Sequence, residues 1–324
     1  MSESKPTALY YEMLNYQEPN IERLEEVFDL IRLETPQADT DDVLREADVG
    51  FAPLGYAYDK EKIDRMPALE VIASNTTGEP HIDRSYAESC GISVFSLKDE
   101  DEFLESITPT AEHTWGLLLA LTRNVPAAYD AVLDGQWNRW DFPGDAMLSN
   151  MTLGIVGLGR LGHLVAEYAD AFRMEEIGFY DPEKESDDVQ CAKKYDDLTE
   201  LVASHDVITI HAPSNEATRN MFDADLFSHF KQGSYVINTA RGAIIDEQAL
   251  VESLAADRLA GAALDVFDGE YEPDHEKRLR SSQLLDYARE NDDLLLTPHI
   301  GGSTYDAWEQ TERRVIEKAI AALE

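Results

Sequence analysis

The sequence predicts an α/β protein with two parallel-sheet domains, and three observations lead to this prediction. The chain has 324 residues, more than a single hydrophobic core usually supports. Its first hundred residues alternate short apolar runs with helical patterns, which indicates a small α/β domain. From Met151 onward the alternation of strands and helices becomes regular, as in a doubly wound parallel sheet.

The N-terminal half supplies the elements of the smaller domain and a connection. Strands are expected at residues 8–11, 49–52 and 71–73, with a helix over residues 21–28. A long helix follows, with Thr110 as its N-cap and a break near Pro126. The stretch 135–147 holds three large aromatic residues without a regular period. We therefore expect an arm or extended loop there, whose aromatic side chains suit a subunit interface.

The second half carries the regular alternation. Strands are predicted at residues 152–156, 177–180, 207–211, 235–238, 260–266 and 294–297, and helices at 161–172, 198–203, 226–230 and 247–256. No internal repeat and no Gly/Ser-rich or Pro-rich linker interrupts this pattern, so the two domains are expected to be joined by structured segments.

Composition excludes several classes of function. The 65 acidic and 27 basic residues give a formal net charge of -38, which disfavours nucleic acid and anionic membranes as partners. Apolar runs fall far short of the ~20 residues that span a bilayer, and the N-terminus shows no signal-peptide core, so a cytoplasmic protein is expected. The simpler interpretation of the acidic surface is that it keeps the protein soluble. The more specific hypothesis is that it is an adaptation to a cytosol of high salt concentration. The two cysteines and eight histidines lack metal-ligand spacing, so no metal site is expected.

A glycine-rich loop follows the first strand of the second half. In the sequence LGIVGLGRLG, Gly157 permits a tight turn, Gly159 lets the backbone approach a pyrophosphate, and Gly162 lets helix and strand pack closely. The helix that begins at Leu161 then presents its N-terminus to the phosphate charge. Arg160 is placed to pair with a phosphate oxygen, with a solvent-facing arginine as the simpler interpretation. The loop predicts a dinucleotide site.

Asp181 ends the next predicted strand, 22 residues after Gly159. A carboxylate there accepts hydrogen bonds from the ribose 2′-hydroxyl of NAD and repels the 2′-phosphate of NADP. The first basic residue that follows is Lys184, which lies between two glutamates. NAD is therefore the expected cofactor, although an aspartate here can also be a plain helix N-cap.

Three segments at predicted strand ends carry the remaining chemistry: NTARGAIID, ALDVFDGE and TPHIGGST, which contain Arg241, Glu270 and His299. The carboxyl ends of parallel strands meet at one sheet edge, where ligands bind in open α/β folds. Hydride transfer to a 2-keto acid needs a cation for the carboxylate and ketone, and a proton donor for the new hydroxyl. Arginine and histidine supply these roles, and a neighbouring glutamate fixes the histidine ring and keeps a proton available.

These segments resemble the D-isomer-specific 2-hydroxyacid dehydrogenase family over essentially the whole chain. The resemblance implies that Arg241, Glu270 and His299 are the catalytic residues, and that the backbone of Thr77 and Gly78 binds the substrate carboxylate with Arg241. It also implies further contacts with the cofactor. His211, Ala212 and Pro213 are expected along the adenosine, Thr239 and Ala240 near the nicotinamide ribose, and Asp265 at the carboxamide. Thr218, His299 and Gly301 complete the set of expected cofactor-binding residues.

The resemblance also implies an organisation. Two Rossmann-like doubly wound domains are expected, a substrate domain formed from both chain ends (residues 1–103 and 300–324) and an NAD-binding domain (104–299). The family commonly forms homodimers through the helix and arm near residues 110–147. The chain stops soon after His299, so a short form without a C-terminal regulatory domain is expected.

The chain departs from the family pattern in two places. The span 271–292 is long and charged, and an extra surface helix is expected there. Phosphoglycerate enzymes carry an arginine for the substrate phosphate where this chain reads APLGYAY, and Glu79 adds negative charge to the carboxylate loop. A substrate with a neutral or hydroxylated tail is therefore expected. Tyr56 either lines its pocket or is a packed surface tyrosine.

Two other functions fit the same fold. An NAD-sensing binding protein, like the corepressors built on this scaffold, is the alternative from another class, and the complete set of Arg241, Glu270 and His299 favours catalysis over it. Formate dehydrogenases share the fold but carry glutamine at the position of Glu270, which disfavours that activity. No motif fixes the side chains of the specificity loops, so the sequence leaves the 2-keto acid unnamed.

Overall fold

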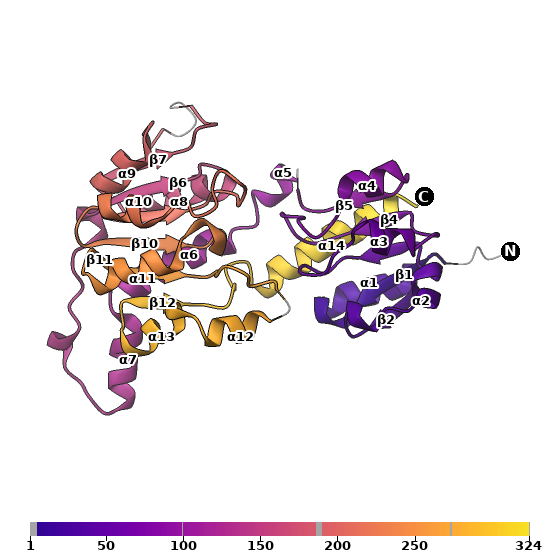
Figure 1. Ribbon diagram of the computed structural model, residues 1–324, viewed down its shortest axis with the longest axis horizontal. Helices are drawn as coiled ribbons and strands as arrows, with labels where there is room; N and C mark the ends of the chain where they lie inside the picture. The colour runs from indigo at the N-terminus through magenta and orange to yellow at the C-terminus, as the bar shows by residue number, and fades with distance from the viewer. Residues whose placement is uncertain (1–4, 99, 186–189, 273, 324) are drawn as a thin grey trace. The chain divides into compact units, whose positions relative to one another are not determined.

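The computed structural model describes residues 5–98, 100–185, 190–272 and 274–323. Its contacts divide the chain into two units (Figure 1), of which unit 1 comprises Met1–Ile107 and Ser303–Glu324 and unit 2 comprises Thr108–Gly302. Each boundary lies a few residues beyond the predicted one. The first moves because helix α6 (Pro109–Thr122) belongs entirely to unit 2. The second moves because the turn after strand β12 (Leu294–Leu296) stays with its sheet.

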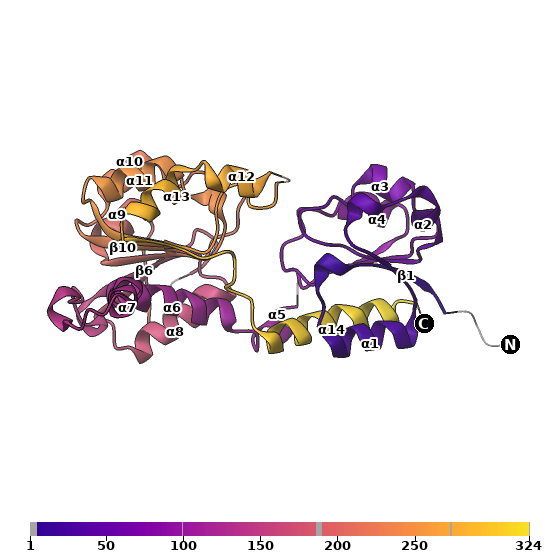
Figure 2. The same cartoon turned by 90° about the horizontal axis from the view of Figure 1, so that it is seen from below.

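Unit 1 is built on a parallel sheet with the strand order β2-β1-β3-β4-β5. The strands are β1 (Thr7–Tyr11), β2 (Asp29–Leu33), β3 (Val49–Phe51), β4 (Val71–Ala73) and β5 (Ser93–Phe95). Helices α1 (Glu18–Val27) and α14 (Tyr305–Ala321) cover one face, and α2 (Asp41–Glu46), α3 (Lys60–Asp64) and α4 (Arg84–Ser89) cover the other (Figure 2). Short α5 (Asp101–Leu104) follows β5. Both chain ends therefore contribute to this unit.

The C-terminal helix is fixed to the N-terminal part by a buried carboxylate. Glu312 on α14 is 2% exposed, and its Oε2 accepts hydrogen bonds from the Gln17 N–H and the Asn20 side-chain amide, both at 2.8 Å. Burial raises the pKa of Glu312, although both hydrogen bonds act in the opposite direction. An ion pair between Arg23 and Glu317 at 2.8 Å extends the same contact toward the end of α14.

Unit 2 contains the larger sheet, with seven parallel strands in the order β12-β11-β10-β9-β6-β7-β8. The strands are β6 (Thr152–Val156), β7 (Glu176–Tyr180), β8 (Lys193–Lys194), β9 (Val207–Ile210), β10 (Ser234–Asn238), β11 (Leu259–Leu264) and β12. Helices α6 and α8 (Arg160–Ala171) pack on one face, and α9 (Leu198–Ser204), α10 (Ala224–His229) and α11 (Glu247–Ala255) pack on the other (Figure 2). The doubly wound α/β prediction is confirmed.

Three local predictions were wrong or incomplete. Strand β2 was missed because it lies at a sheet edge, where Asp29 and Arg32 interrupt the apolar run. Strand β5 was missed because it begins with the exposed polar Ser93, and β8 was missed because it has only two residues, both lysines. The N-cap of α6 is Thr108 rather than Thr110, because Pro109 is suited to the first helical position. The break near Pro126 is confirmed, since α7 (Val125–Leu133) starts there with the proline in its first turn.

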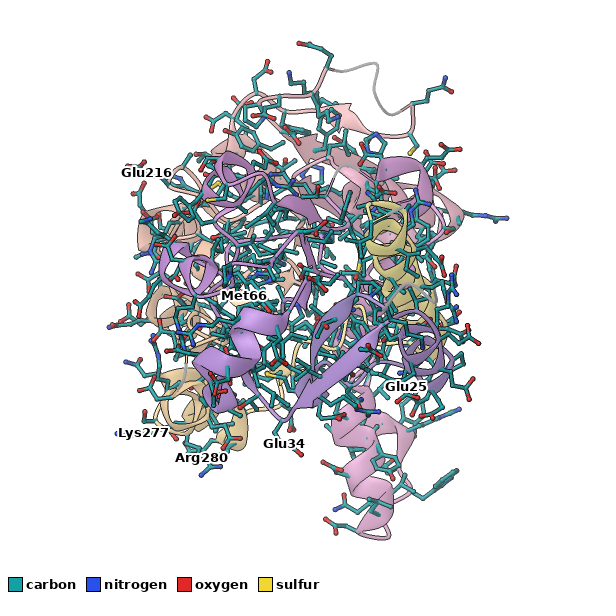
Figure 3. All side chains as sticks on the ribbon, turned by 90° about the vertical axis from the view of Figure 1, so that its right-hand side faces the viewer. Glu25, Glu34, Met66, Glu216, Lys277 and Arg280 are labelled. Atoms are coloured by element: carbon teal, nitrogen blue, oxygen red, sulfur yellow. The ribbon has the colours of Figure 1, made fainter. Side chains whose placement is uncertain are left out.

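The long span after Glu270 forms two helices. They are α12 (His275–Arg280) and α13 (Gln283–Glu290), so the predicted surface helix is present as a pair. Lys277 and Arg280 on α12 are exposed and point outward (Figure 3). Leu284 on α13 is fully buried, which anchors the pair to unit 2.

None of the helices in the described ranges is long and apolar enough to cross a membrane.

Candidate active site

The glycine loop connects β6 to α8 at the carboxyl edge of the larger sheet. Gly157 has a φ of +92°, and a Cβ there would lie 2.6 Å from the Ala212 nitrogen. A Cβ at Gly162 would lie 2.3 Å from the Gly157 carbonyl oxygen. In contrast, a Cβ at Gly159 would meet nothing within 4 Å, so this part of the loop faces open space. The loop thus has the close packing and the open side that a bound pyrophosphate requires.

Asp181 lies directly after β7 and faces the same loop. Its Oδ2 accepts the Leu158 N–H at 2.8 Å, and its Oδ1 accepts the Glu183 N–H at 2.9 Å. Each carboxylate oxygen has a second lone pair, so the side chain retains acceptors for the two hydroxyls of a ribose. Arg160 and Leu161 form the first turn of α8, whose N–H groups are directed toward the space above the loop. These residues fit NAD.

The segment after β9 closes the other side of the loop. His211 is partly buried, its Nε2 lies 2.8 Å from the Thr209 hydroxyl, and desolvation lowers its pKa to about 4. It is therefore neutral at physiological pH. Ala212 packs beneath Gly157. The exposed Thr218 hydroxyl donates to the Pro213 carbonyl at 2.6 Å and fixes the intervening turn.

Arg241 follows β10, and its backbone is held by buried neighbours. The Asn238 side chain donates to the Arg241 carbonyl at 2.9 Å and accepts the Ala240 N–H at 3.0 Å. Thr239 is buried, with its hydroxyl 2.8 Å from that of Thr114. A Cβ at Gly242 would lie 2.0 Å from the Phe267 carbonyl carbon, so only glycine allows these two segments to approach. The partly buried guanidinium donates to the Ala240 carbonyl at 2.6 Å and retains four further N–H groups for a ligand.

Asp265 directly follows β11 and holds the turn that carries His299. Its carboxylate accepts the Thr297 hydroxyl at 2.6 Å, the Ile300 N–H at 2.9 Å and the Gly301 N–H at 2.7 Å. Burial acts to raise the pKa of Asp265, but these hydrogen bonds and the His113 ring outweigh it, so the pKa is lowered. The charged carboxylate therefore fixes the turn. The Gly301 N–H is used within this network, and a Cβ at Gly301 would lie 2.9 Å from Asp265 Oδ2.

His299 and Glu270 form a hydrogen-bonded pair. His299 Nδ1 lies 2.8 Å from Glu270 Oε2. The backbone of His299 has a φ of +52°, a value that residues other than glycine seldom adopt. The side chain of Glu270 is 11% exposed and that of His299 is 34% exposed. A carboxylate only accepts hydrogen bonds, so the proton lies on Nδ1. No residue in the described ranges hydrogen-bonds Nε2, which is the nitrogen left for chemistry.

The other predicted substrate-binding residues, Thr77, Gly78 and Tyr56, lie in unit 1. Thr77 and Gly78 are in the loop after β4, where the Thr76 hydroxyl donates to the Gly78 carbonyl at 2.6 Å. Within the described part of the chain, no group accepts the N–H of Thr77 or Gly78. Both N–H groups are thus available for an anion. Tyr56 is half-buried, and its hydroxyl accepts a hydrogen bond from Gln37 at 3.0 Å.

Glu79 does not add free negative charge to that loop, contrary to the sequence interpretation. Its carboxylate accepts two hydrogen bonds from Arg84 at 2.7 Å, one from Ser96 at 2.8 Å and one from Lys98 at 3.4 Å. Two cationic partners neutralise it within unit 1. The arginine hydrogen bonds, together with those of Ser96 and Lys98, overcome the effect of burial and lower the pKa of Glu79 to about 2.

This ion pair has a measurable effect on stability. We expect Glu79→Gln to reduce the free energy of unfolding by roughly 1–3 kcal/mol at pH 7, because Arg84 loses a partly buried bidentate partner. The folded-state pKa is depressed, so the stabilisation is complete above the ordinary glutamate value and is lost as pH falls toward about 2. Urea unfolding of both proteins at pH 7 and 3.5 measures this difference. A gap that stays constant with pH contradicts the assignment.

Several functional neighbours were absent from the sequence prediction. Asn238 and Gly242 position Arg241, and His113 lies 3.3 Å from the Asp265 carboxylate. Tyr271 places its hydroxyl 3.1 Å from His299 Nδ1, and both Glu270 and Arg241 act on it electrostatically. Its position directly after Glu270 is the only signal in the sequence that could have indicated it.

The comparisons with known proteins agree with this geometry. Residues 115–301, more than half of the chain, match the family model described as D-isomer specific 2-hydroxyacid dehydrogenase, NAD binding domain. The chain belongs to this family. It is accordingly an NAD-dependent dehydrogenase of 2-hydroxy acids, and the NAD prediction is confirmed.

Individual relatives span most of the chain. A putative 2-hydroxyacid dehydrogenase of Staphylococcus aureus is 34% identical over 268 residues, which cover 82% of this chain and 80% of the relative. A D-3-phosphoglycerate dehydrogenase of Methanocaldococcus jannaschii is 35% identical over 266 residues. These cover 82% of this chain but 47% of that protein, so the chain spans about half of its length. The Aquifex aeolicus D-lactate dehydrogenase, solved with NAD and lactic acid, is 26% identical with a TM-score of 0.80, covering 98% of this chain and 95% of that one.

Proposed function

We propose that this dehydrogenase interconverts a 2-keto acid and the (R)-2-hydroxy acid through His299. The observation that carries this proposal is the His299–Glu270 pair at 2.8 Å, which leaves Nε2 as the free nitrogen. When bound, NADH supplies the hydride. His299 Nε2–H donates the proton to the new hydroxyl, and in the reverse direction the neutral Nε2 accepts it. Glu270 holds the ring by accepting Nδ1–H throughout.

Arg241 is the proposed substrate-binding cation. Its remaining guanidinium N–H groups suit the planar, bidentate recognition of a carboxylate, and its charge polarises the adjacent ketone. The N–H groups of Thr77 and Gly78 are the proposed carboxylate-binding groups of unit 1. We accordingly assign unit 1 as the substrate domain and unit 2 as the NAD-binding domain.

The proposal is tested by NADH oxidation with a panel of keto acids. Glyoxylate, pyruvate, hydroxypyruvate, branched-chain and sugar-derived keto acids should include at least one substrate. Every chiral product, which excludes the glycolate formed from glyoxylate, should be the (R) enantiomer by chiral chromatography. Turnover that yields the (S) acid, or no turnover with any member while NADH binds normally, contradicts the proposed reaction.

Asp181 should determine the choice of cofactor. We expect Asp181→Ser to weaken NADH binding about tenfold and to strengthen NADPH binding, because the carboxylate no longer accepts the ribose hydroxyls or repels the 2′-phosphate. Fluorescence titration with both cofactors measures the two dissociation constants. Asp197→Ser, which alters the exposed N-cap of α9, is the matched control. An unchanged ratio of the two constants in Asp181→Ser would remove the aspartate from this role.

We also propose that the enzyme is a homodimer. Helix α7 has no buried residue in this single chain, although six of its nine residues are apolar alanine, valine or leucine. The large exposed side chains of the helix and the following arm are Val125, Tyr129, Val132, Leu133, Trp137, Trp140 and Met147. Clustered aromatic and aliphatic side chains of this kind are typical of a protein interface. Light scattering should give twice the monomer mass, and Trp137→Ser with Leu133→Ser should reduce it.

The cytoplasm and high salt are the proposed setting. Both cysteines are free and Cys90 is exposed, as expected in a reducing compartment. Acidic side chains such as Glu25, Glu34 and Glu216 are exposed, and these three are labelled in Figure 3. At 1 M salt a Debye length of about 3 Å screens their mutual repulsion. The melting temperature should therefore rise markedly from low to molar KCl, and a flat response contradicts the halophilic proposal.

A further inference from the structure

Tyr271 is a second partner of the catalytic histidine. It directly follows Glu270, and its hydroxyl oxygen lies 3.1 Å from His299 Nδ1, the same nitrogen that Glu270 Oε2 contacts at 2.8 Å. The phenol and imidazole ring centroids are 5.9 Å apart with an interplanar angle of 51°. The contact is therefore made through the hydroxyl at the ring edge, not by stacking.

One side of this contact faces a largely apolar cavity, while Tyr271 as a whole is 39% exposed. Tyr271, Glu270 and His299 line a cavity of about 520 Å³ whose other walls come from the ends of β11 and β12 and from α12 and α13. Its apolar lining includes Leu264, Leu279, Leu284, Leu285 and Leu296. The helices of the span 271–292 thus shield one side of the pair.

The protonation states of His299 determine what the hydroxyl does. Both states used in the proposed reaction, the imidazolium and the neutral ring with a free Nε2, carry a proton on Nδ1. A group within hydrogen-bonding distance of Nδ1 must therefore accept in both states. A phenol oxygen can accept a share of this N–H while its own proton points elsewhere.

We propose that Tyr271 is a positioning residue that, together with Glu270, accepts the Nδ1–H of His299 and thereby fixes the ring with Nε2 directed to the substrate. This inference rests on the proposed role of His299. Tyr271 contributes no atom to the reaction, and it acts only through the orientation and tautomer of the histidine. The span 271–292 consequently shapes the catalytic pair.

Other charged groups near the pair do not take this role. The Asp265 carboxylate is occupied by the Thr297 hydroxyl and the 300–301 backbone. His275 and Glu276 line the same cavity from α12, but His275 Nδ1 lies 2.9 Å from the Glu272 carbonyl. Arg241 is a donor and cannot accept from Nδ1. Desolvation, with the charge of Glu270, raises the pKa of Tyr271, so the phenol is neutral at physiological pH.

Steady-state kinetics of Tyr271→Phe test the proposal, with Tyr287→Phe as the matched control. Tyr287 lies on α13 in the same span, and its hydroxyl contacts Asp293 Oδ2 at 3.1 Å, away from His299. We expect Tyr271→Phe to lower kcat three- to tenfold with little change in KM, because one of two shared hydrogen bonds to the acid is lost. On a Glu270→Gln background the loss should be larger, since the anionic acceptor of Nδ1–H is then absent as well. Tyr287→Phe should match the wild type.

A spectroscopic measurement separates this inference from the proposed function. Two-bond ¹H–¹⁵N correlation spectra report which ring nitrogen carries the proton, and they need no substrate or turnover. The neutral His299 signal, assigned by its absence in His299→Gln, should show the Nδ1–H tautomer in wild type and a growing Nε2–H fraction in Tyr271→Phe. An unchanged tautomer ratio together with an unchanged kcat overturns the role of Tyr271. If the wild-type enzyme shows no turnover but the tautomer ratio still changes in Tyr271→Phe, only the proposed reaction is overturned.

Discussion

Replacement of His299 by alanine is expected to lower kcat for keto acid reduction by about 10³-fold while leaving the dissociation constant for NADH unchanged. The imidazole is the proposed proton donor, and general acid catalysis by a positioned side chain contributes on the order of 10²–10⁴ in rate. Glu270 cannot replace it, because its Oε2 is directed to Nδ1 and the carboxylate is only 11% exposed. Stopped-flow absorbance at 340 nm after mixing with NADH and substrate measures the hydride-transfer step directly.

The matched control is His229→Ala, which removes an exposed histidine at the end of α10 on the same unit. It should retain wild-type kinetics and melting temperature. If His299→Ala instead weakens NADH binding in parallel with kcat, the residue holds the cofactor loop and is not the acid. If kcat falls less than tenfold, water or another side chain supplies the proton.

The parts of the site that sequence could predict are those fixed by spacing along the backbone. The spacing of Gly157 and Gly162 predicts the loop conformation, because both residues of the close contact lie within a few positions of each other. A Cβ at Gly162 would lie 2.3 Å from the Gly157 carbonyl oxygen, so only glycine fits there. The prediction of Arg241, Glu270 and His299 at one sheet edge depended only on strand direction. All three strands are parallel neighbours in the order β12-β11-β10, so their carboxyl ends meet as expected.

Side-chain direction was the part that could not be predicted. Glu79 was interpreted as loop charge because its partners Arg84 and Lys98 lie on other elements, and nothing in the order of residues indicates which way a carboxylate turns. The family resemblance places Asp265 at the carboxamide, and nothing in the sequence indicated that its oxygens also bind the turn of His299, 32 to 36 residues away. Edge strand β2 escaped detection for a related reason, since only one side of it is covered by another strand.

Arg241 should show the second large effect, and the choice of substitution separates charge from geometry. Arg241→Gln is expected to lower kcat/KM about 10³-fold, because both carboxylate binding and polarisation of the ketone are lost. Arg241→Lys keeps the charge but loses the planar fork, so it should recover only part of this loss, mainly in kcat and with KM still raised. Initial-rate kinetics over a range of keto acid concentrations distinguish the two constants.

Arg219→Gln provides the control for this experiment, since Arg219 is an exposed arginine of unit 2 paired with Asp268 at 3.2 Å. Its kinetics should stay close to wild type. If Arg241→Lys were fully active, a point charge would suffice and bidentate recognition would be wrong. If Arg241→Gln raised KM alone with kcat intact, the guanidinium would bind the ground state and the transition state equally, and polarisation of the ketone would have to come from His299 instead.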